Sequence, residues 1–267
     1  MTDQTQPAVC NALITGAATR IGQAIAIGLA KSGWHVAIHY NGSQEAANAT
    51  AEACAAFGVS AVTVQADLAN DQETAKAFED AQSALGPLSL VVNNASLFEF
   101  DDFASASNES WHAHMQVNLH GPFILSQALA QNLPEGMHGN IINLIDQRVW
   151  KLTPDFTSYT LSKAGLWTLT QTAAQALAPR IRVNAIAPGP TLKSSRQSEE
   201  SFTQQVAAVP LQIQPGLEEF TNAVAFILAS PSLTGQMIAL DGGQHLAWET
   251  PDVSGDILTM TAGCLQM

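Results

Sequence analysis

The residues best suited to do chemistry are Tyr159 and Lys163, which stand four positions apart in an Ala-rich stretch of helical character. On a helix, this spacing brings both side chains to one face. An ammonium group beside a phenol favours the phenolate, so we expect Lys163 to lower the pKa of Tyr159 and make it a usable proton donor. Because surface Tyr–Lys pairs are common by chance, this interpretation needs support from other motifs.

A glycine-containing turn, Thr15–Gly22, follows the first expected strand and precedes an apolar helix. Gly16 permits the tight turn, and Gly22 allows the helix to pack closely on the strand. The free N–H groups at the start of the helix suit a pyrophosphate, so we assign Gly16, Arg20 and Ile21 to cofactor binding. A cation at a helix N-terminus opposes the helix dipole, so Arg20 indicates an anion nearby. An ordinary turn is the alternative.

The end of the second expected strand distinguishes between nicotinamide cofactors. NAD sites usually place an Asp or Glu there to hold the ribose 2′-OH, but this chain has no acid between His39 and Ser43. The neutral donors Tyr40, Asn41 and Ser43 suit a 2′-phosphate better than a carboxylate would. The sequence therefore favours NADP(H) over NAD(H), although Arg and Lys are also missing from this loop.

The elements that must position these residues alternate along the chain. Seven short β-branched runs are expected strands: 12–15, 35–39, 60–64, 88–92, 140–145, 182–187 and 237–240. Six stretches are expected helices: 23–31, 44–57, 71–85, 109–129, 158–178 and 217–229. This alternation predicts one α/β domain over residues 1–267, with a mostly parallel seven-stranded sheet that has helices on both faces.

The composition excludes several classes of function. The 267 residues are 46% hydrophobic and 12% charged, with a net charge of −13, so disorder is excluded. Binding to nucleic acid or to an anionic membrane needs clustered cations, which this chain lacks. No signal pattern precedes residue 9, and the apolar runs are too short to span a membrane. We expect a cytoplasmic protein.

The cysteines and histidines do not predict a metal site. The three cysteines are far apart, without CxxC spacing, which argues against disulfides and structural zinc and fits a reducing compartment: Cys10, Cys54 and Cys264. Three histidines look like a cluster but do not converge on one helix face: His112, His114 and His120. We therefore expect no metal.

With these motifs in place, the sequence resembles the short-chain dehydrogenase/reductase family from about residue 12 to residue 243. The matching pieces follow the family's order: Thr15-Gly16…Gly22, Asp67-Leu68, Asn93-Asn94-Ala95, Asn118, Tyr159 with Lys163, Pro188-Gly189 and Asp241-Gly242-Gly243. The resemblance implies a single-domain, doubly wound Rossmann fold and a homotetramer. It also implies an oxidoreductase with a small-molecule substrate.

The resemblance further implies roles for individual positions. Asp67 and Leu68 would contact the adenine, and Asn94 and Ala95 would lie along the cofactor. The nicotinamide would be bordered by three residues after the sixth expected strand: Pro188, Gly189 and Thr191. Two further residues complete the catalytic set. Lys163 would hold the nicotinamide ribose, and Asn118 would anchor a water chain behind the lysine.

The sequence departs from most of the family at Asp146, thirteen residues before the tyrosine, where a serine usually binds the substrate carbonyl. An ionised carboxylate cannot donate a hydrogen bond to a carbonyl, and it raises the pKa of a neighbouring phenol. The substitution should therefore harm simple ketone reduction. It suits reduction of a C=N bond, because the nitrogen must receive a proton that a carboxylic acid can relay.

A subgroup of the family, the pteridine reductases and related dihydromonapterin/dihydrofolate reductases, is more similar. It shares three features with this chain: Asp146 with Tyr159 and Lys163, Arg20-Ile21-Gly22, and Asn94-Ala95-Ser96-Leu97-Phe98. By resemblance, a planar pterin would lie between Phe98 and the nicotinamide. Ser96 and Arg20 would reach its polar edge, and Ser96 would also contact the cofactor. The chain departs from this subgroup at Gly42, where the subgroup has an arginine.

Three segments fall outside the regular pattern. Residues 1–8 are expected to be a flexible N-terminus, and the polar stretch 192–216 a mobile lid over the substrate. The tail 244–267 carries Trp248 and other apolar residues, which predicts packing against a neighbouring subunit.

Three functions remain open from the sequence. The favoured one is reduction of a dihydropterin with NAD(P)H, with proton delivery by Tyr159 and Asp146. A carbonyl or 3-oxoacyl reductase of the same family is the second. A non-catalytic NADP(H)-binding sensor or scaffold is the third, although a pure binder need not keep the proton relay of Asn118, Tyr159 and Lys163.

Overall fold

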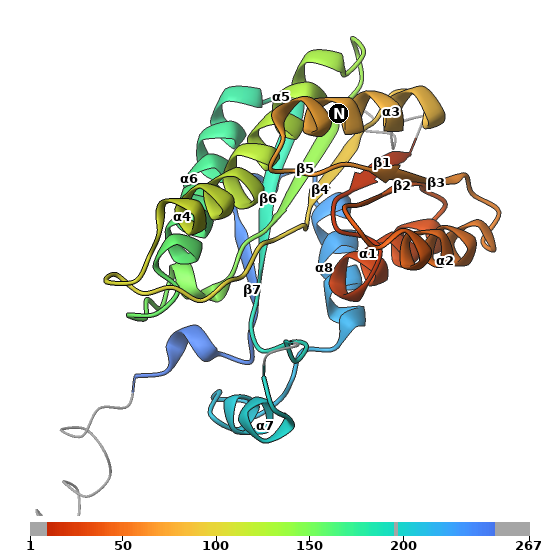
Figure 1. Ribbon diagram of the computed structural model, residues 1–267. Helices are drawn as coiled ribbons and strands as arrows, with labels where there is room; N and C mark the ends of the chain where they lie inside the picture. The colour runs from red at the N-terminus through yellow and green to blue at the C-terminus, as the bar shows by residue number, and fades with distance from the viewer. Residues whose placement is uncertain (1–9, 195–196, 249–267) are drawn as a thin grey trace, which may run out of the picture.

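A computed structural model describes residues 10–194 and 197–248 (Figure 1). Seven strands form one sheet in the order β3-β2-β1-β4-β5-β6-β7, and every neighbouring pair is parallel. The strands are β1 Asn11–Ile14, β2 His35–Tyr40, β3 Ala61–Gln65, β4 Leu90–Asn93, β5 Gly139–Leu144, β6 Ile181–Pro188 and β7 Met237–Leu240. The predicted doubly wound α/β fold is confirmed, and the sheet is fully rather than mostly parallel.

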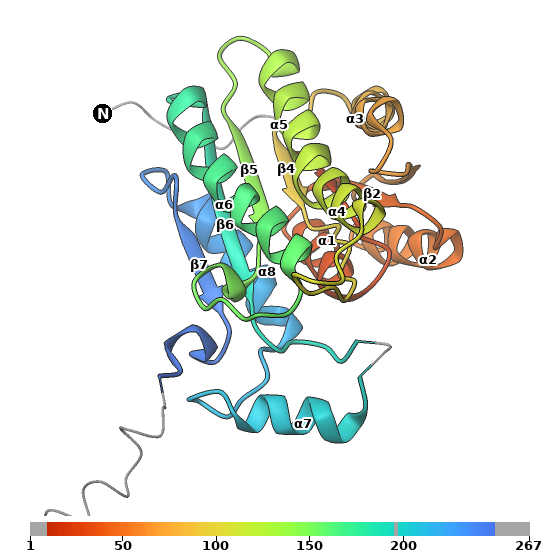
Figure 2. The same cartoon turned by 60° about the vertical axis from the view of Figure 1, so that its left-hand side comes forward.

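Helices cover both faces of the sheet. They are α1 Arg20–Lys31, α2 Gln44–Ala55, α3 Asp71–Leu85, α4 Asn108–Met115, α5 Gly121–Asn132, α6 Thr157–Leu177, α7 Glu199–Ala207 and α8 Leu217–Ala229. One core lies between the sheet and α1, α2 and α8, and the other lies between the sheet and α3, α5 and α6 (Figure 2). Within β1, Ala12 and Ile14 face the first core and Leu13 faces the second, as the alternation of a strand requires.

The helix expected over 109–129 is interrupted, which corrects the prediction of one continuous helix. The chain runs from α4 through a π-helical turn, η1 Gln116–His120, into α5. Pro122 lies in the first turn of α5 and has no N–H to donate to the carbonyl of Asn118 four residues earlier. The wider turn accommodates this missing bond and places Asn118 in the interior, with no exposed surface.

The direction of the sheet decides where function can lie. Because all strands are parallel and buried on both faces, polar side chains leave the core at the carboxyl edge. The strand order reverses between β1 and β4, and open α/β sheets bind ligands at such a point. Helix α7 lies beyond this edge, away from the two helical layers (Figures 1 and 2).

The described residues meet neither the requirements of a membrane-spanning helix nor those of a metal site. No helix there has the length and apolar character needed to cross a membrane. No group of three or more His, Cys, Asp or Glu side chains there is suited to holding a metal ion. The expected N-terminal segment 1–8 and most of the tail 244–267 lie outside the described residues.

We expect Gly189→Ala to destabilise the fold, because a Cβ at this position would lie 2.5 Å from the backbone Cα of Asp241. Backbone atoms cannot give way as a flexible side chain can, so the free energy of unfolding should fall by about 1–3 kcal/mol. Gly42→Ala is the control, since a Cβ there meets nothing within 4 Å. Urea unfolding of both variants measures the difference, and equal stability would contradict the close-approach argument.

Candidate active site

An inner cleft of about 550 Å³ opens at the carboxyl edge of the sheet, where the strand order reverses. Its lining includes most of the residues predicted from the sequence: Gly16, Arg20, Ile21, Asn41, Asp67, Leu68, Asn94, Ala95, Ser96, Phe98, Asp146, Tyr159, Lys163, Pro188 and Gly189. These residues come from loops and helices far apart in the sequence. The structure therefore brings most of the predicted cofactor and catalytic residues to one place.

The glycine turn forms one wall of the cleft. Gly16 has a φ of +60°, and a Cβ there would lie 3.0 Å from the Cα of Ala95. The hydroxyl of Thr15 accepts hydrogen bonds from the N–H groups of Asn94 and Ala95, both at 2.9 Å. The turn after β1 and the loop after β4 are thus held against each other, with no room for a side chain at Gly16.

His39 is a residue of this wall that sequence reasoning missed. It is buried, its Nδ1 accepts a hydrogen bond from the Gly16 N–H at 3.1 Å, and its Nε2 lies 3.1 Å from the Ala66 carbonyl. This pairing requires the neutral ring with a proton on Nε2. Burial lowers the pKa of His39 to about 4, which keeps the ring neutral at working pH. Its only signal in the sequence is its place at the end of β2.

Only some of the residues predicted to select the cofactor lie in the lining of the cleft. Asn41 is exposed in the cleft lining, whereas Tyr40 and Ser43 are not among the residues that line this cleft. Tyr40 packs against the core, and Ser43 is the N-cap residue of α2. Asp67 borders the cleft, but its Oδ1 also accepts the Ala69 N–H at 2.9 Å, as a loop cap does.

The catalytic candidates meet at the inner end of the cleft. Tyr159 and Lys163 lie one turn apart on α6, and both are buried. The Tyr159 hydroxyl lies 2.8 Å from Oδ2 of Asp146, and Oδ1 of Asp146 accepts the Arg148 N–H at 2.8 Å. Lys163 donates from Nζ to the Leu144 carbonyl at 2.8 Å. A carboxyl group thus contacts the phenol directly, with the ammonium group on the same face of the helix.

The electrostatics correct the expectation that Lys163 lowers the pKa of Tyr159. Burial and the adjacent Asp146 raise the pKa of Tyr159 well above its usual value, and the ammonium group bonds a backbone carbonyl instead of the phenol. Burial also raises the pKa of Asp146, although one side of the residue borders the cleft. Burial lowers the pKa of Lys163 to about 8. Tyr159 is therefore a protonated donor whose neighbour Asp146 holds a proton more readily than an exposed aspartate.

Asn118 stands behind this group rather than in the cleft lining. Its Oδ1 accepts the Leu97 N–H at 2.8 Å, and its Nδ2 donates to the Leu97 carbonyl at 2.9 Å and to Ser162 Oγ at 3.0 Å. Both amide hydrogens are used. The side chain fixes the loop after β4 to α6, and the water chain implied by the family resemblance stays a prediction.

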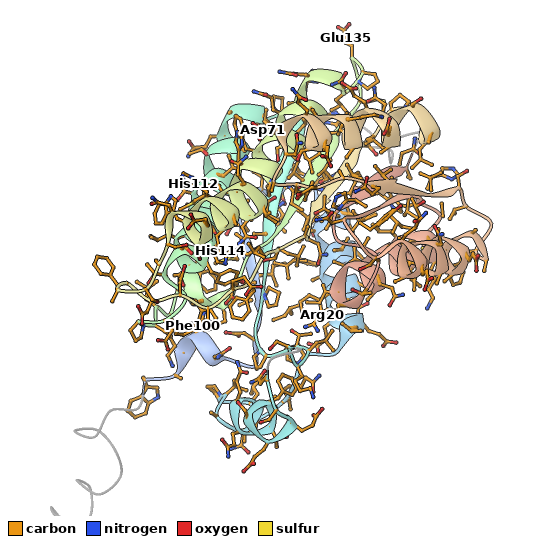
Figure 3. All side chains as sticks on the ribbon, viewed as in Figure 1. Arg20, Asp71, Phe100, His112, His114 and Glu135 are labelled. Atoms are coloured by element: carbon orange, nitrogen blue, oxygen red, sulfur yellow. The ribbon has the colours of Figure 1, made fainter. Side chains whose placement is uncertain are left out.

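An outer cavity of about 830 Å³ adjoins the cleft and continues toward α7. The predicted lid contributes to its lining from its described part: Leu192, Ser194, Gln197, Ser198, Ser201, Phe202 and Gln205. Thr191, predicted to border the nicotinamide, also lines this cavity. Figure 3 labels Arg20. Its guanidinium donates to the carbonyls of Leu192 and Lys193 at 2.9 and 3.0 Å, which joins the start of α1 to the segment before α7. Arg20 thus contacts the lid backbone in this structure, and its predicted contact with a phosphate stays a prediction.

An aromatic stack lies where the two cavities adjoin, since Phe98 lines both of them. Phe98 is 41% exposed, so it is a cavity residue and not a core aromatic. Its ring stacks on Phe156 with centroids 4.4 Å apart and makes a T-shaped contact with the Tyr159 ring, with centroids 4.6 Å apart. Phe156 has a left-handed backbone, with a φ of +61°, at the N-cap of α6. The stack places an apolar surface beside the phenol of Tyr159.

Asp101 is the second group that sequence reasoning missed. The N-cap residue of α6 offers no side-chain cap, and Asp101 supplies one from the loop after β4. Its backbone carbonyl accepts the Phe156 N–H at 2.6 Å, and its carboxylate accepts from the N–H and the hydroxyl of Ser158. Ser158 Oγ also lies 2.7 Å from Nδ1 of His114, which is buried on α4. The Ser–His–Asp set is enclosed and serves to hold the start of α6.

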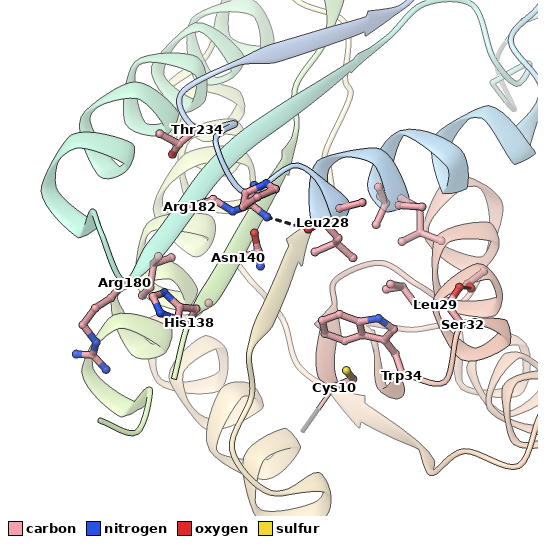
Figure 4. A pocket seen from close by; sticks show the side chains of 18 of the residues that line it. Cys10, Leu29, Ser32, Trp34, His138, Asn140, Arg180, Arg182, Leu228 and Thr234 are labelled. Carbon is pink, nitrogen blue, oxygen red and sulfur yellow. Dashed lines mark hydrogen bonds between the residues drawn. The ribbon is translucent and has the colours of Figure 1, made fainter. Parts of the chain in front are cut away.

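A third cavity, of about 730 Å³, lies at the opposite end of the sheet (Figure 4). Arg182 lines it and donates to the carbonyls of Leu233 and Leu228 at 2.8 and 3.2 Å, the latter near the C-terminus of α8. Arg180 donates to the carbonyls of Leu133 and Pro134, just after α5. These cations stabilise helix ends, and the cavity holds none of the predicted catalytic residues.

Comparison with known proteins identifies the family. Residues 10–204 match the family described as short chain dehydrogenase. A 3-oxoacyl-[acyl-carrier-protein] reductase of Staphylococcus epidermidis is 32% identical over 241 residues, which is 88% of this chain and 99% of that protein. The chain belongs to the short-chain dehydrogenase family and is an oxidoreductase of that type.

Two solved structures are similar throughout. An alternative dihydrofolate reductase 1 (FolM) from Brucella canis, complexed with NADP, is 52% identical with a TM-score of 0.89, over 92% of this chain and 97% of that chain. The corresponding protein from Brucella suis, also in complex with NADP, is 51% identical with a TM-score of 0.90, over 93% and 100%. The predicted resemblance to the pteridine and dihydrofolate reductase subgroup is confirmed.

We expect Asp101→Ala to lower both stability and turnover, because it leaves two donors of Ser158 and the hydroxyl of Ser110 without their acceptor. Unsatisfied buried donors cost about 1–3 kcal/mol, which urea unfolding measures. Burial raises the pKa of Asp101, but the bonds from Ser158 and Ser110 outweigh it and hold the pKa below its usual value. The deficit should therefore be full at neutral pH and shrink as the pH falls through that lowered pKa.

The control is Asp155→Ala, which removes an exposed aspartate just before α6. It should leave stability and turnover near those of the unmodified protein. Equal losses in the two variants would show that the Asp101 carboxylate does not hold the start of α6.

Proposed function

We propose that this chain is an NADP(H)-dependent reductase of the C=N bond of a dihydropterin. The observation that carries the proposal is the 2.8 Å contact between Tyr159 and Asp146, at the position where most of the family has a serine. A carbonyl needs a hydrogen-bond donor at that position, which an ionised carboxylate cannot be. A C=N bond needs a proton, which a carboxyl group of raised pKa can supply.

The residues present fit a nicotinamide dinucleotide. Gly16 leaves the backbone open at the N-terminus of α1, where N–H groups and the helix dipole favour phosphate. Asn41, at the end of β2, brings no carboxylate that would repel a 2′-phosphate. The similar reductases from Brucella canis and Brucella suis are both complexed with NADP. These observations support NADP(H) over NAD(H).

Side chains of this protein would supply the proton that the reaction needs. Bound NADPH supplies a hydride to the carbon of the C=N bond. The Tyr159 hydroxyl donates a proton to the nitrogen, and the Asp146 carboxyl returns a proton to the phenolic oxygen. Burial raises the pKa of both groups and so favours their protonated forms. Lys163, held by the Leu144 carbonyl, keeps positive charge near the transient phenolate and is placed to hold the nicotinamide ribose.

The substrate would bind where the inner cleft meets the outer cavity. Phe98 and Tyr159 border both spaces, so a flat ring stacked on Phe98 would lie beside the proton donor. Ser96 and Arg20 line the same region and offer polar groups to the edge of a pterin. We place Pro188, Gly189 and Thr191 at the nicotinamide.

A carbonyl or 3-oxoacyl reductase is the second candidate. It is favoured by the 32% identity to the Staphylococcus epidermidis 3-oxoacyl-[acyl-carrier-protein] reductase over 99% of that protein. The homotetramer, the cytoplasmic location and the mobility of the lid over 192–216 stay predictions.

The deciding experiment follows NADPH absorbance with the purified protein and a dihydropterin, beside a panel of ketones and quinones and an NADH control. We expect saturable oxidation with the dihydropterin and a preference for NADPH. Asp146→Ser should lower pterin turnover by about 10²–10⁴-fold, the usual contribution of acid–base catalysis. The rate of the same variant on ketones is measured beside its rate on the dihydropterin. Turnover of carbonyl compounds alone would reject the pterin proposal.

We expect Phe98→Ala to raise KM for the dihydropterin more than it lowers kcat, because the ring binds substrate without moving a proton. Loss of a stacked aromatic contact of about 1.4 kcal/mol corresponds to about a tenfold weaker complex. Phe103→Ala is the matched control, since that ring is 92% exposed and lines neither cavity. Steady-state kinetics of both variants test the stack, and an unchanged KM in Phe98→Ala would contradict it.

A further inference from the structure

Arg148 is a cation at the border of the outer cavity that the proposed reaction has not used. Its Nη1 donates to Thr153 Oγ1 at 2.5 Å, and its guanidinium carbon lies 4.9 Å from the centroid of the Phe156 ring. Its Nε is buried without a hydrogen-bond partner, and Arg148 forms no ion pair within residues 10–194 and 197–248. An arginine that forms no ion pair among the described residues is unusual in a chain of net charge −13.

The surroundings hold this guanidinium in place. Phe156 is itself fixed, since its N–H bonds the Asp101 carbonyl at 2.6 Å and its ring stacks on Phe98. A planar guanidinium packs on an aromatic face better than a lysine ammonium does. The contacts with Phe156 and Thr153 therefore determine where the charge lies.

Arg148 lies two positions after Asp146, and its backbone contacts the Asp146 carboxyl directly. The Arg148 N–H donates to Oδ1 of Asp146 at 2.8 Å, in the short helical turn η2 Gln147–Val149. The guanidinium acts on the same carboxyl through space and lowers the pKa of Asp146 and of Tyr159, against the larger effect of burial. Lys163 is the other cation that acts on Asp146, but its own pKa is about 8. A guanidinium stays charged at every pH at which the protein is folded.

We propose that Arg148 is a positioning residue of this active site, which favours the charged form of Asp146 and so sets the upper pH limit of proton delivery through Tyr159. The kinetic part of this inference rests on the proposed reductase function. The electrostatic part does not need the reaction, because it concerns two residues that line the same outer cavity and are joined through the Arg148 N–H.

The groups that face Asp146 come from two elements. Helix α6 contributes Tyr159 and Lys163, and η2 contributes Arg148. The rim of the cleft adds Arg20, whose guanidinium is held by the carbonyls before α7. Removal of the Arg148 charge should therefore leave Asp146 with Lys163 as its cationic partner, and the carboxyl should keep its proton to a higher pH.

The first test is the pH profile of kcat for Arg148→Met. Proton delivery needs the protonated carboxyl, so activity falls as the pH rises through the Asp146 titration. Loss of the opposite charge that favours ionised Asp146 should move this falling limb upward by about one pH unit. Arg148→Lys keeps a charge and should restore the limb toward its original position.

Lys151→Met is the matched control for this test. It removes the same charge three positions further along the chain, from a residue that lines neither cavity. Its profile should match that of the unmodified protein. An Arg148→Met profile that coincides with that of Lys151→Met would overturn the proposal.

The second test needs no substrate or cofactor. Urea unfolding from mildly acidic to mildly alkaline pH compares the unmodified protein, Arg148→Met, Asp146→Asn and the double variant. Arg148→Met raises the pKa of Asp146 in the folded state only, so its loss of stability should grow as the pH rises through that titration and then level off. In the Asp146→Asn background, the effect of Arg148→Met should no longer depend on pH.

The two tests separate two kinds of failure. If the protein does not reduce dihydropterins, the proposed function fails, and unfolding still decides the electrostatic role of Arg148. If Arg148→Met lowers stability by the same amount at every pH, in both backgrounds, the residue has a packing role only and the proposal is wrong. If Arg148→Met does not fold, Arg148→Gln takes its place in both tests, with the same expected shifts.

Discussion

The start of helix α6 depends on a carboxylate from another part of the chain. Phe156 occupies the N-cap position in a left-handed conformation and cannot cap the helix, so Asp101 accepts the first N–H groups instead. The same loop is held by the Asn118 amide at Leu97 and by His114, which accepts the Glu99 N–H at 3.1 Å. These three attachments hold Phe98 beside Tyr159. The substrate side of the site thus depends on how a helix terminus is satisfied.

The parallel sheet restricts where the polar residues of the site can lie. A parallel sheet covered on both faces has little space for polar side chains except where the strands end. Thr15, Asn94 and Gly189 all follow strand ends, and each contacts a neighbouring loop rather than a helix. The cleft is therefore walled largely by backbone and small residues. This leaves the two larger functional groups, Tyr159 and Lys163, to enter from a helix.

Much of this fold could be predicted because its signals are local. The seven strands are short β-branched runs, and the expected helices over 71–85 and 217–229 match α3 and α8 at both ends. The glycine turn and the Tyr159–Lys163 spacing predicted residues that now share one cleft. The interruption at η1 was missed because helical periodicity continues through it. Pro122 was the available signal, since it removes one backbone donor.

The missed parts of the site depend on contacts between distant segments. Asp101 and Ser158 are 57 positions apart, and His39 lies 23 positions from Gly16, so no spacing rule connects them. The pKa of Tyr159 was misjudged for the same reason. Sequence placed Lys163 one turn away on the same helix, but the Leu144 carbonyl, which takes the ammonium group, is contributed by β5.

Burial of these groups together has a chemical consequence. Removal from water raises the pKa of Asp146 and lowers that of Lys163 to about 8, so the two values approach each other. In water an aspartate and a lysine differ by more than about six pKa units, and proton transfer between them is strongly one-sided. As these two pKa values approach each other, the free-energy difference for moving a proton between Asp146 and Lys163 becomes smaller. Efficient acid catalysis requires such small differences between proton donor and acceptor. The stacked rings of Phe98 and Phe156 add an apolar surface next to the Tyr159 ring, so the buried Tyr159, which contacts Asp146, lies beside side chains that offer no competing polar group.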